Sequence, residues 1–124
     1  STPSNSSAAS DVYKRQIIEA SPLLLLDEPD SALDFSNRHL LMQHIRSIVS
    51  DGRCALMCIH SPELALEYCD NILLMKSGTI LSTINTHTDS LDIINEKMSL
   101  IYDNINVIEC TDINHKTHRV VVAL

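Results

Sequence analysis

Three side chains that could act together on a phosphate stand directly after apolar runs. Asp27 and Glu28 follow the run "LLLL" at 23–26, and His60 follows the run "CALMCI" at 54–59. A buried run would hold the carboxylate of Asp27 in place, where it can support Mg²⁺ through the water shell of that ion. The next carboxylate can orient an attacking water, and a histidine on a neighbouring strand can donate a hydrogen bond to a terminal phosphate. Together these residues are suited to hydrolysis of a nucleoside triphosphate.

Each of these features also has a simpler explanation. An apolar run that ends in Asp-Glu is often only a strand meeting solvent, and a histidine after a strand is more often structural than catalytic. The order of the elements indicates that Asp27, Glu28 and His60 lie close together. Strand, helix, strand, helix, strand is typical of a parallel α/β sheet, in which ligands bind beyond the carboxyl ends of the strands.

The hydrophobic pattern from residue 17 onward predicts the elements that would position this site. We expect strands at 23–27, 54–59 and 71–75, a turn at 76–78 and a return strand at 79–84 that completes a hairpin, with helices at 37–49 and from 62 to about 69. Ser61 is a suitable N-cap, Pro62 a suitable first helical residue, and Gly52 stands where the earlier helix would stop. After Asp89 we expect one or two short helices to about Tyr102, then strands at 106–110 and 119–124.

Composition excludes several classes of function. The net charge is −7 and the basic residues are scattered, which disfavours a face that binds nucleic acid. No apolar run is long enough to cross a bilayer. The four cysteines form no C-x-x-C pair, so we expect reduced thiols in the core of a cytosolic protein. Solvated surface histidines are favoured over metal pairs such as His39 with His44 or His115 with His118.

Four motifs in order resemble the C-terminal half of an ABC-type ATPase domain. "LLLLDEP" matches the Walker B strand of that family, "SALD" at 31–34 its D-loop, and the strand ending in His60 its H-loop. "HSPELALEYCDNILLMKSGTI" at 60–80 is similar to the family's stretch from the switch histidine to the closing hairpin. The resemblance implies an α/β fold, a partial P-loop NTPase fold of ABC type with a parallel sheet, crossover helices and a small α+β C-terminal extension.

The resemblance also implies roles for individual residues. Asp27 matches the aspartate that supports Mg²⁺, Glu28 the catalytic glutamate, and His60 the histidine that contacts the γ-phosphate of ATP. Ser31 and Asp34, at the two ends of the D-loop match, would lie near the nucleotide at the interface with a second ATPase subunit. ATP and Mg²⁺ are the implied cofactors.

The first half of such a domain is missing from the sequence. Neither of its two glycines belongs to a G-x-x-x-x-G-K-[ST] loop, and "PSNSS" stands where the LSGGQ signature is expected. Residues 1–16 are Ser-rich, and "DVYKRQ" resembles the translation of a transposon-end adapter used in sequencing libraries; a natural flexible tail is the alternative. We expect 1–16 to be a disordered, non-native scar, 17–84 the ATPase half-domain and 85–124 a C-terminal helix with a small β unit.

Function follows from the resemblance as an expectation. The full-length parent is expected to be the ATP-hydrolysing subunit of an ABC transporter, by resemblance an importer. The tail at 98–124 resembles the C-terminal extension of importer ATPases for iron-siderophore, haem or cobalamin-type substrates, and a generic helix with a hairpin packed on the sheet is the alternative. Its partners would be a second ATPase subunit and membrane permease subunits, which would hold it at the cytoplasmic face of the membrane without inserting it. The chain alone is expected to be inactive. A soluble non-transport ABC ATPase and an inactive, short ABC-like interaction protein are the alternatives.

Overall fold

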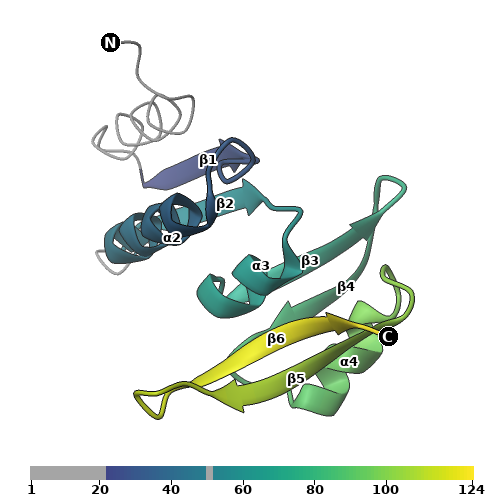
Figure 1. The fold of residues 1–124 in the computed structure, drawn as a ribbon. Coiled ribbons are helices and arrows are strands. Elements are labelled where there is room, and N and C mark those ends of the chain that lie inside the picture. Colours follow the sequence, from purple (N-terminus) through teal and green to yellow (C-terminus); the bar gives the residue numbers. More distant parts are fainter. Residues whose placement is uncertain (1–21, 50–51) are drawn as a thin grey trace. The chain divides into compact units, whose positions relative to one another are not determined.

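The computed structural model describes residues 22–49 and 52–124, which divide into two compact units (Figure 1). The first unit ends at Ser61 and the second begins at Pro62. Among these described residues, no helix is long and apolar enough to span a membrane. The segment 1–16, which we expect to be non-native, lies outside them.

The first unit is a parallel strand pair with a crossover helix. Strand β1 (Leu23–Asp27) leads into helix α2 (Phe35–Val49), and the chain returns as strand β2 (Cys54–Cys58). The strands pair in parallel, with Leu23 opposite Cys54 and Asp27 opposite Cys58. The predicted strand, helix, strand order is confirmed, and the shared register brings both carboxyl ends to one edge.

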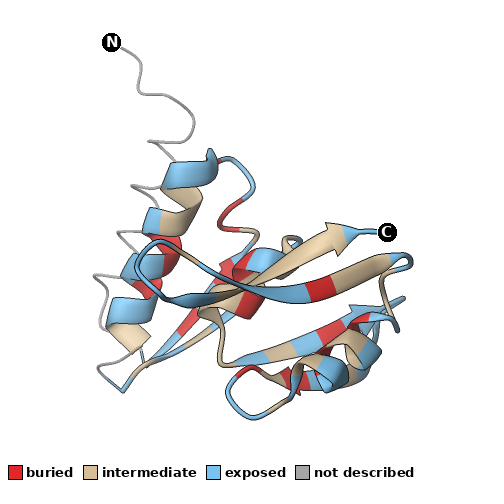
Figure 2. Cartoon of the chain, turned by 60° about the horizontal axis from the view of Figure 1, so that its bottom comes forward, coloured by how far each residue is buried: buried red, intermediate tan, exposed pale blue. Residues whose placement is uncertain are grey.

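Among residues 22–49 and 52–61, only one face of this strand pair is covered. Leu24 and Leu26 in β1 are each 4% exposed, whereas Leu25 between them is 64% exposed and its partner Leu56 is 54% exposed. Figure 2 colours the chain by burial and shows buried and exposed residues close together along its elements. Helix α2 packs on β2 and buries three residues, Leu41, Met42 and Ile45. A continuous apolar run is typical of a strand buried on both faces. Because the first half of the domain is missing from the sequence, one face is expected to be uncovered, and every second side chain of β1 is exposed.

The second unit consists of two antiparallel hairpins and two helices. Its elements are α3 (Pro62–Tyr68), β3 (Asn71–Lys76), β4 (Thr79–Asn85), α4 (Leu91–Met98), β5 (Ile105–Thr111) and β6 (Thr117–Ala123). Strand β3 pairs with β4 in antiparallel fashion across the turn at 76–78, which confirms the predicted hairpin; among the described residues β3 has no parallel partner. Ser77 and Gly78 in the connecting turn both have positive φ, 53° and 77°, which matches the twist of a two-residue hairpin.

One apolar core joins the two hairpins. Helix α4 packs on β4 and β5, and α3 packs on β6. The buried residues of the core are Leu66, Leu74, Ile84, Ile94, Met98 and Val107. Because Ile84 and Ile94 are both fully buried in it, the boundary that we expected between residues 84 and 85 falls inside this unit.

Helix α4 is fixed to β5 by a side-chain amide. Asn95 Nδ2 donates to the carbonyl of Val107 (2.9 Å), and the amide of Val107 donates to Asn95 Oδ1 (2.7 Å). The amide side chain of Asn95 thus forms both hydrogen bonds that a neighbouring strand would form with Val107. The backbone N–H and C=O of this buried residue therefore both have partners.

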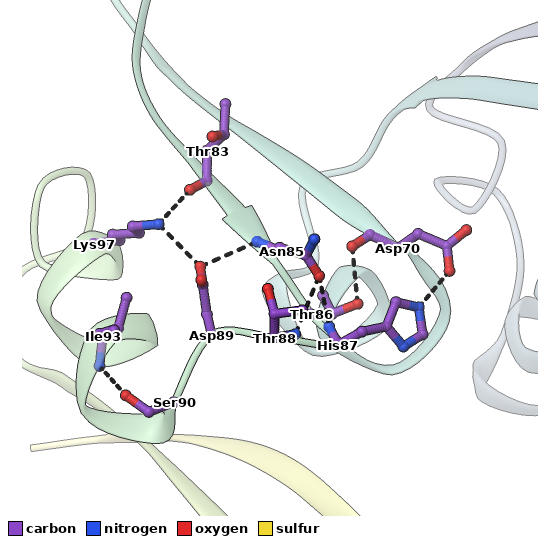
Figure 3. Close-up of polar contacts among 10 residues, drawn as sticks. All are labelled: Asp70, Thr83, Asn85, Thr86, His87, Thr88, Asp89, Ser90, Ile93 and Lys97. Carbon is purple, nitrogen blue, oxygen red and sulfur yellow. Dashed lines mark hydrogen bonds and ion pairs between the residues drawn. The ribbon is translucent and has the colours of Figure 1, made fainter.

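A polar network holds the turn between β4 and α4 (Figure 3). The carboxylate of Asp89 accepts hydrogen bonds from the amide of Asn85 (3.1 Å) and from Lys97 Nζ (2.9 Å), and Lys97 also donates to the carbonyl of Thr83. The hydrogen bond from Lys97, followed by that from Asn85, lowers the pKa of Asp89. Ser90 caps the helix by accepting from the amide of Ile93.

The cysteines do not lie where we expected them. All four are free thiols, but Cys54, Cys58 and Cys110 are exposed and Cys69 is half-buried. The expectation of core thiols is therefore wrong. Cys54 and Cys58 stand on β2 at even spacing with Leu56, so they share the uncovered face of the first unit.

The second unit contains a histidine held between two carboxylates. His118 on β6 places Nε2 2.6 Å from Asp112 Oδ2 and Nδ1 3.2 Å from Glu67 Oε1 on α3. Lys116 Nζ lies 3.5 Å from the same oxygen of Glu67. Both ring nitrogens can donate only when the imidazole is protonated. The hydrogen bond to Asp112, followed by that to Glu67, therefore raises the pKa of His118, and His118 in turn lowers the pKa of Asp112.

Stability of the chain should depend on pH through His118. A group whose pKa is raised on folding stabilises the folded state below its unfolded pKa, and this contribution is lost as pH rises through the folded pKa. We expect the free energy of unfolding in urea to fall as pH rises above about 6.5, the usual pKa of histidine, and this fall to be smaller in His118→Gln. His44→Gln, at an exposed position on α2, is the control and should keep the full dependence. Equal pH dependence in His118→Gln and the unaltered chain would contradict this prediction.

Candidate functional site

The predicted site lies at the carboxyl ends of β1 and β2. The amide of Glu28, one residue beyond β1, donates to the carbonyl of Cys58 at the end of β2 (3.1 Å), which extends the ladder past Asp27. Two residues after Cys58 the imidazole of His60 forms an ion pair with the carboxylate of Glu28 through Nε2 and Oε1. The parallel register thus brings together the two residues that the sequence predicts to be catalytic.

The Glu28 and His60 pair is open to solvent. The side chain of His60 is 84% exposed and that of Glu28 is 42% exposed. An ion pair this exposed contributes little to stability, because water screens it. Its significance is geometric: a carboxylate and an imidazole meet at an accessible edge, where a substrate could reach both.

A tight turn follows Glu28. The amide of Ser31 donates to the carbonyl of Glu28 (3.2 Å), and the amide of Leu33 donates to the carbonyl of Asp30 (3.1 Å). Glu28 itself has a φ of +48°, in the left-handed region that is uncommon for residues other than glycine. Two residues of this turn are buried: Pro29 is fully buried and Asp30 is 7% exposed. Their burial fixes the turn against the interior of the unit.

The other predicted site residues lie along the same segment with different surroundings. Asp27 is exposed at the end of β1, and Ser31 is exposed in the turn. Asp34 precedes α2, and its Oδ1 accepts from the amide of Asn37 (2.9 Å). That bond is a helix cap, so a structural role alone accounts for the carboxylate of Asp34.

Two residues that shape this site were missed in the sequence. Cys58 supplies the carbonyl that fixes the backbone of Glu28, and Pro29 is the buried anchor beside it. The proline directly after Asp-Glu was a visible signal for the second of these. No sequence pattern signals the first, because any residue type offers the same carbonyl.

The donor types at this edge suit a nucleotide with Mg²⁺. Mg²⁺ prefers oxygen ligands, keeps several waters and takes one or two carboxylates from a protein beside the phosphates of its substrate. Asp27 offers one such carboxylate at an exposed strand end. His60 can donate to a phosphate oxygen, and Glu28 can accept from a water. The residues present therefore fit these groups.

Part of the chain is similar in sequence to known proteins that share one name. No protein-family model matches it. Over 60 residues, 48% of its length, it is 47% identical to the hemin import ATP-binding protein HmuV of Pseudomonas entomophila. Over 68 residues, 54% of its length, it is 41% identical to the protein of the same name from Plesiomonas shigelloides. The matches cover 24% and 26% of those two proteins, so the chain spans about a quarter of the length of these curated relatives.

A solved structure shares the fold over more of the chain. It is an inward-facing conformation of a transporter assigned to the metal-chelate type of ABC transporter. The TM-score is 0.65 at 21% sequence identity, and the match covers 82% of this chain and 40% of that one. At this identity the likeness shows a common fold.

Proposed function

We propose that this chain, which is part of an ABC-type ATPase domain, comes from the ATP-hydrolysing subunit of an importer for haem or a related metal chelate. The predicted partial fold of that family is confirmed by the structural likeness. The names of the curated relatives support the importer class and the kind of substrate. The single observation that carries the chemistry is the direct pairing of Glu28 with His60 at the carboxyl ends of adjacent parallel strands.

In the proposed reaction these residues act on the terminal phosphate of ATP. Glu28 accepts a hydrogen bond from the attacking water and takes its proton as the oxygen bonds to the γ-phosphorus. The bond between that phosphorus and the bridging oxygen breaks, and ADP leaves. His60 donates a hydrogen bond to a γ-phosphate oxygen and stabilises the charge that develops there. Asp27 would hold Mg²⁺ through water, and the ion would neutralise phosphate charge.

Residues 31–34 are proposed to serve the assembly rather than the chemistry. Ser31 is exposed and therefore accessible to a second ATPase subunit and to the nucleotide shared with it. Asp34 would keep this segment ordered, because it caps the helix that follows. Permease subunits would then place the parent at the cytoplasmic face of the membrane, and no contact with nucleic acid is proposed.

Transport by the reconstituted parent tests this function. The full-length subunit would be assembled in liposomes with the permease encoded beside its gene, and ATP-driven uptake of radiolabelled haem would be measured. We expect uptake with the unaltered subunit and with Glu96→Gln, an exposed glutamate on α4, and none with Glu28→Gln. ATP turnover by the assembled complex without uptake of haem or an iron-siderophore, or the lack of a permease gene beside that of the subunit, would instead favour a non-transport ABC ATPase.

A further inference from the structure

We propose that Pro29 is a positioning residue that holds the carboxylate of Glu28 in its working orientation. This inference rests on the proposed function, since it assumes that Glu28 acts on the hydrolytic water. It starts from the backbone outlier at Glu28, whose φ of +48° is costly for a residue with a side chain.

The residue type that follows makes this conformation still less favourable. A residue before proline is driven toward extended backbone, because the proline ring clashes with helical conformations of its predecessor. The remaining described residues other than glycine with positive φ are Ser77, Asn104 and His115, and none of them precedes a proline. Such strain persists only where the surrounding structure over-determines it.

The surroundings of Glu28 hold its backbone in this conformation by several contacts. On one side its amide is bonded to the carbonyl of Cys58 (3.1 Å), and on the other its carbonyl accepts from the amide of Ser31 (3.2 Å). Pro29 is fully buried between these bonds. Because proline has no N–H, burying it leaves no backbone donor without a partner. Proline by itself favours extended backbone at its predecessor, so it is the burial of the ring, together with the two hydrogen bonds, that holds Glu28 in the left-handed region.

The left-handed backbone determines where the carboxylate points. In a continued strand, residue 28 would simply alternate to the face opposite Asp27. The strand instead ends at Asp27, and the carboxylate of Glu28 meets the imidazole of His60, which follows the neighbouring strand. Loss of the buried ring would let this carboxylate move away from His60, and a displacement of about 1 Å can cost about 100-fold in rate.

The test is ATP hydrolysis by the full-length parent with Pro29→Ala. We expect kcat to fall about 10- to 100-fold while KM for ATP changes less than about twofold. Pro22→Ala is the matched control, because Pro22 is exposed before β1, and it should leave both constants unchanged. In single-turnover experiments Pro29→Ala should have little further effect in a Glu28→Gln background, since it acts through that carboxylate. Additive losses, or a loss in KM alone, would overturn the inference.

A stability measurement covers the case in which Pro29→Ala does not fold. Glycine adopts a positive φ without strain, so Glu28→Gly should unfold at a higher temperature than Glu28→Ala. The reverse order would show that the backbone of residue 28 is not held in the left-handed region, and would overturn the inference. If Glu28→Gln retains normal turnover, the proposed function fails; if it is inactive while Pro29→Ala is normal, only the role of Pro29 fails.

Discussion

Glu28→Gln in the full-length parent is expected to lower kcat for ATP hydrolysis by about 10²- to 10⁴-fold, the range that a positioned proton acceptor supplies. Glutamine has nearly the shape of glutamate and still accepts a hydrogen bond, but it cannot take the proton of the attacking water. Binding of ATP should therefore survive. The measurement is steady-state phosphate release together with equilibrium binding of ATP.

Glu96→Gln is the matched control for this variant, since it makes the same substitution at an exposed site on α4. It should hydrolyse ATP at the normal rate. Normal turnover by Glu28→Gln would remove Glu28 from the proposed catalytic role, whereas loss of ATP binding would indicate a binding role instead.

His60→Ala is expected to lower kcat by about 10²- to 10³-fold, as removal of one preorganised donor does in other enzymes. The reason is that His60 contacts Glu28 in the structure and would be the donor to the γ-phosphate in the proposed reaction. The measurement is again phosphate release, with His44→Ala as control, because His44 is exposed on α2 away from the strand ends. Equal rates for His60→Ala and His44→Ala would contradict the role of His60.

The first unit could largely be predicted from the sequence because its signals are local. The run at 23–26 ends at Asp27 in the structure, and the helix predicted at 37–49 is α2, Phe35–Val49. The neighbouring ends of two parallel strands follow from topology, so the meeting of Glu28 with His60 could also be expected.

Burial was harder to predict because it depends on distant parts of the chain. The apolar run at 23–26 indicates a strand buried on both sides, but in the described residues a single helix covers one side and leaves Leu25 in solvent. The antiparallel partner of β3 could be predicted, because the turn at 76–78 is a local signal, and Ser77 and Gly78 do turn the chain back there. The local pattern thus identifies strands and tight turns, but not how far distant parts of the chain cover them.

The details of the site were the least predictable. The left-handed backbone of Glu28 and the buried ring of Pro29 depend on the carbonyl of Cys58, about thirty residues along the chain. The cap formed by Asp34 could have been predicted, because Asp is favoured directly before a helix. The resemblance places Asp34 at an interface instead, and that role stays a proposal.

If the proposed function is right, the ends of β1 and β2 supply only part of the site that binds ATP. The sequence has no G-x-x-x-x-G-K-[ST] loop to hold phosphates, so the chain as it stands should not turn over ATP. The most direct measurement is recovery of the coding sequence upstream of residue 17. We predict a continuous reading frame that encodes such a loop, followed by an LSGGQ motif about one helix before Leu23. A start codon near residue 17, with neither motif upstream, would contradict the assignment of this chain to half of an ATPase domain.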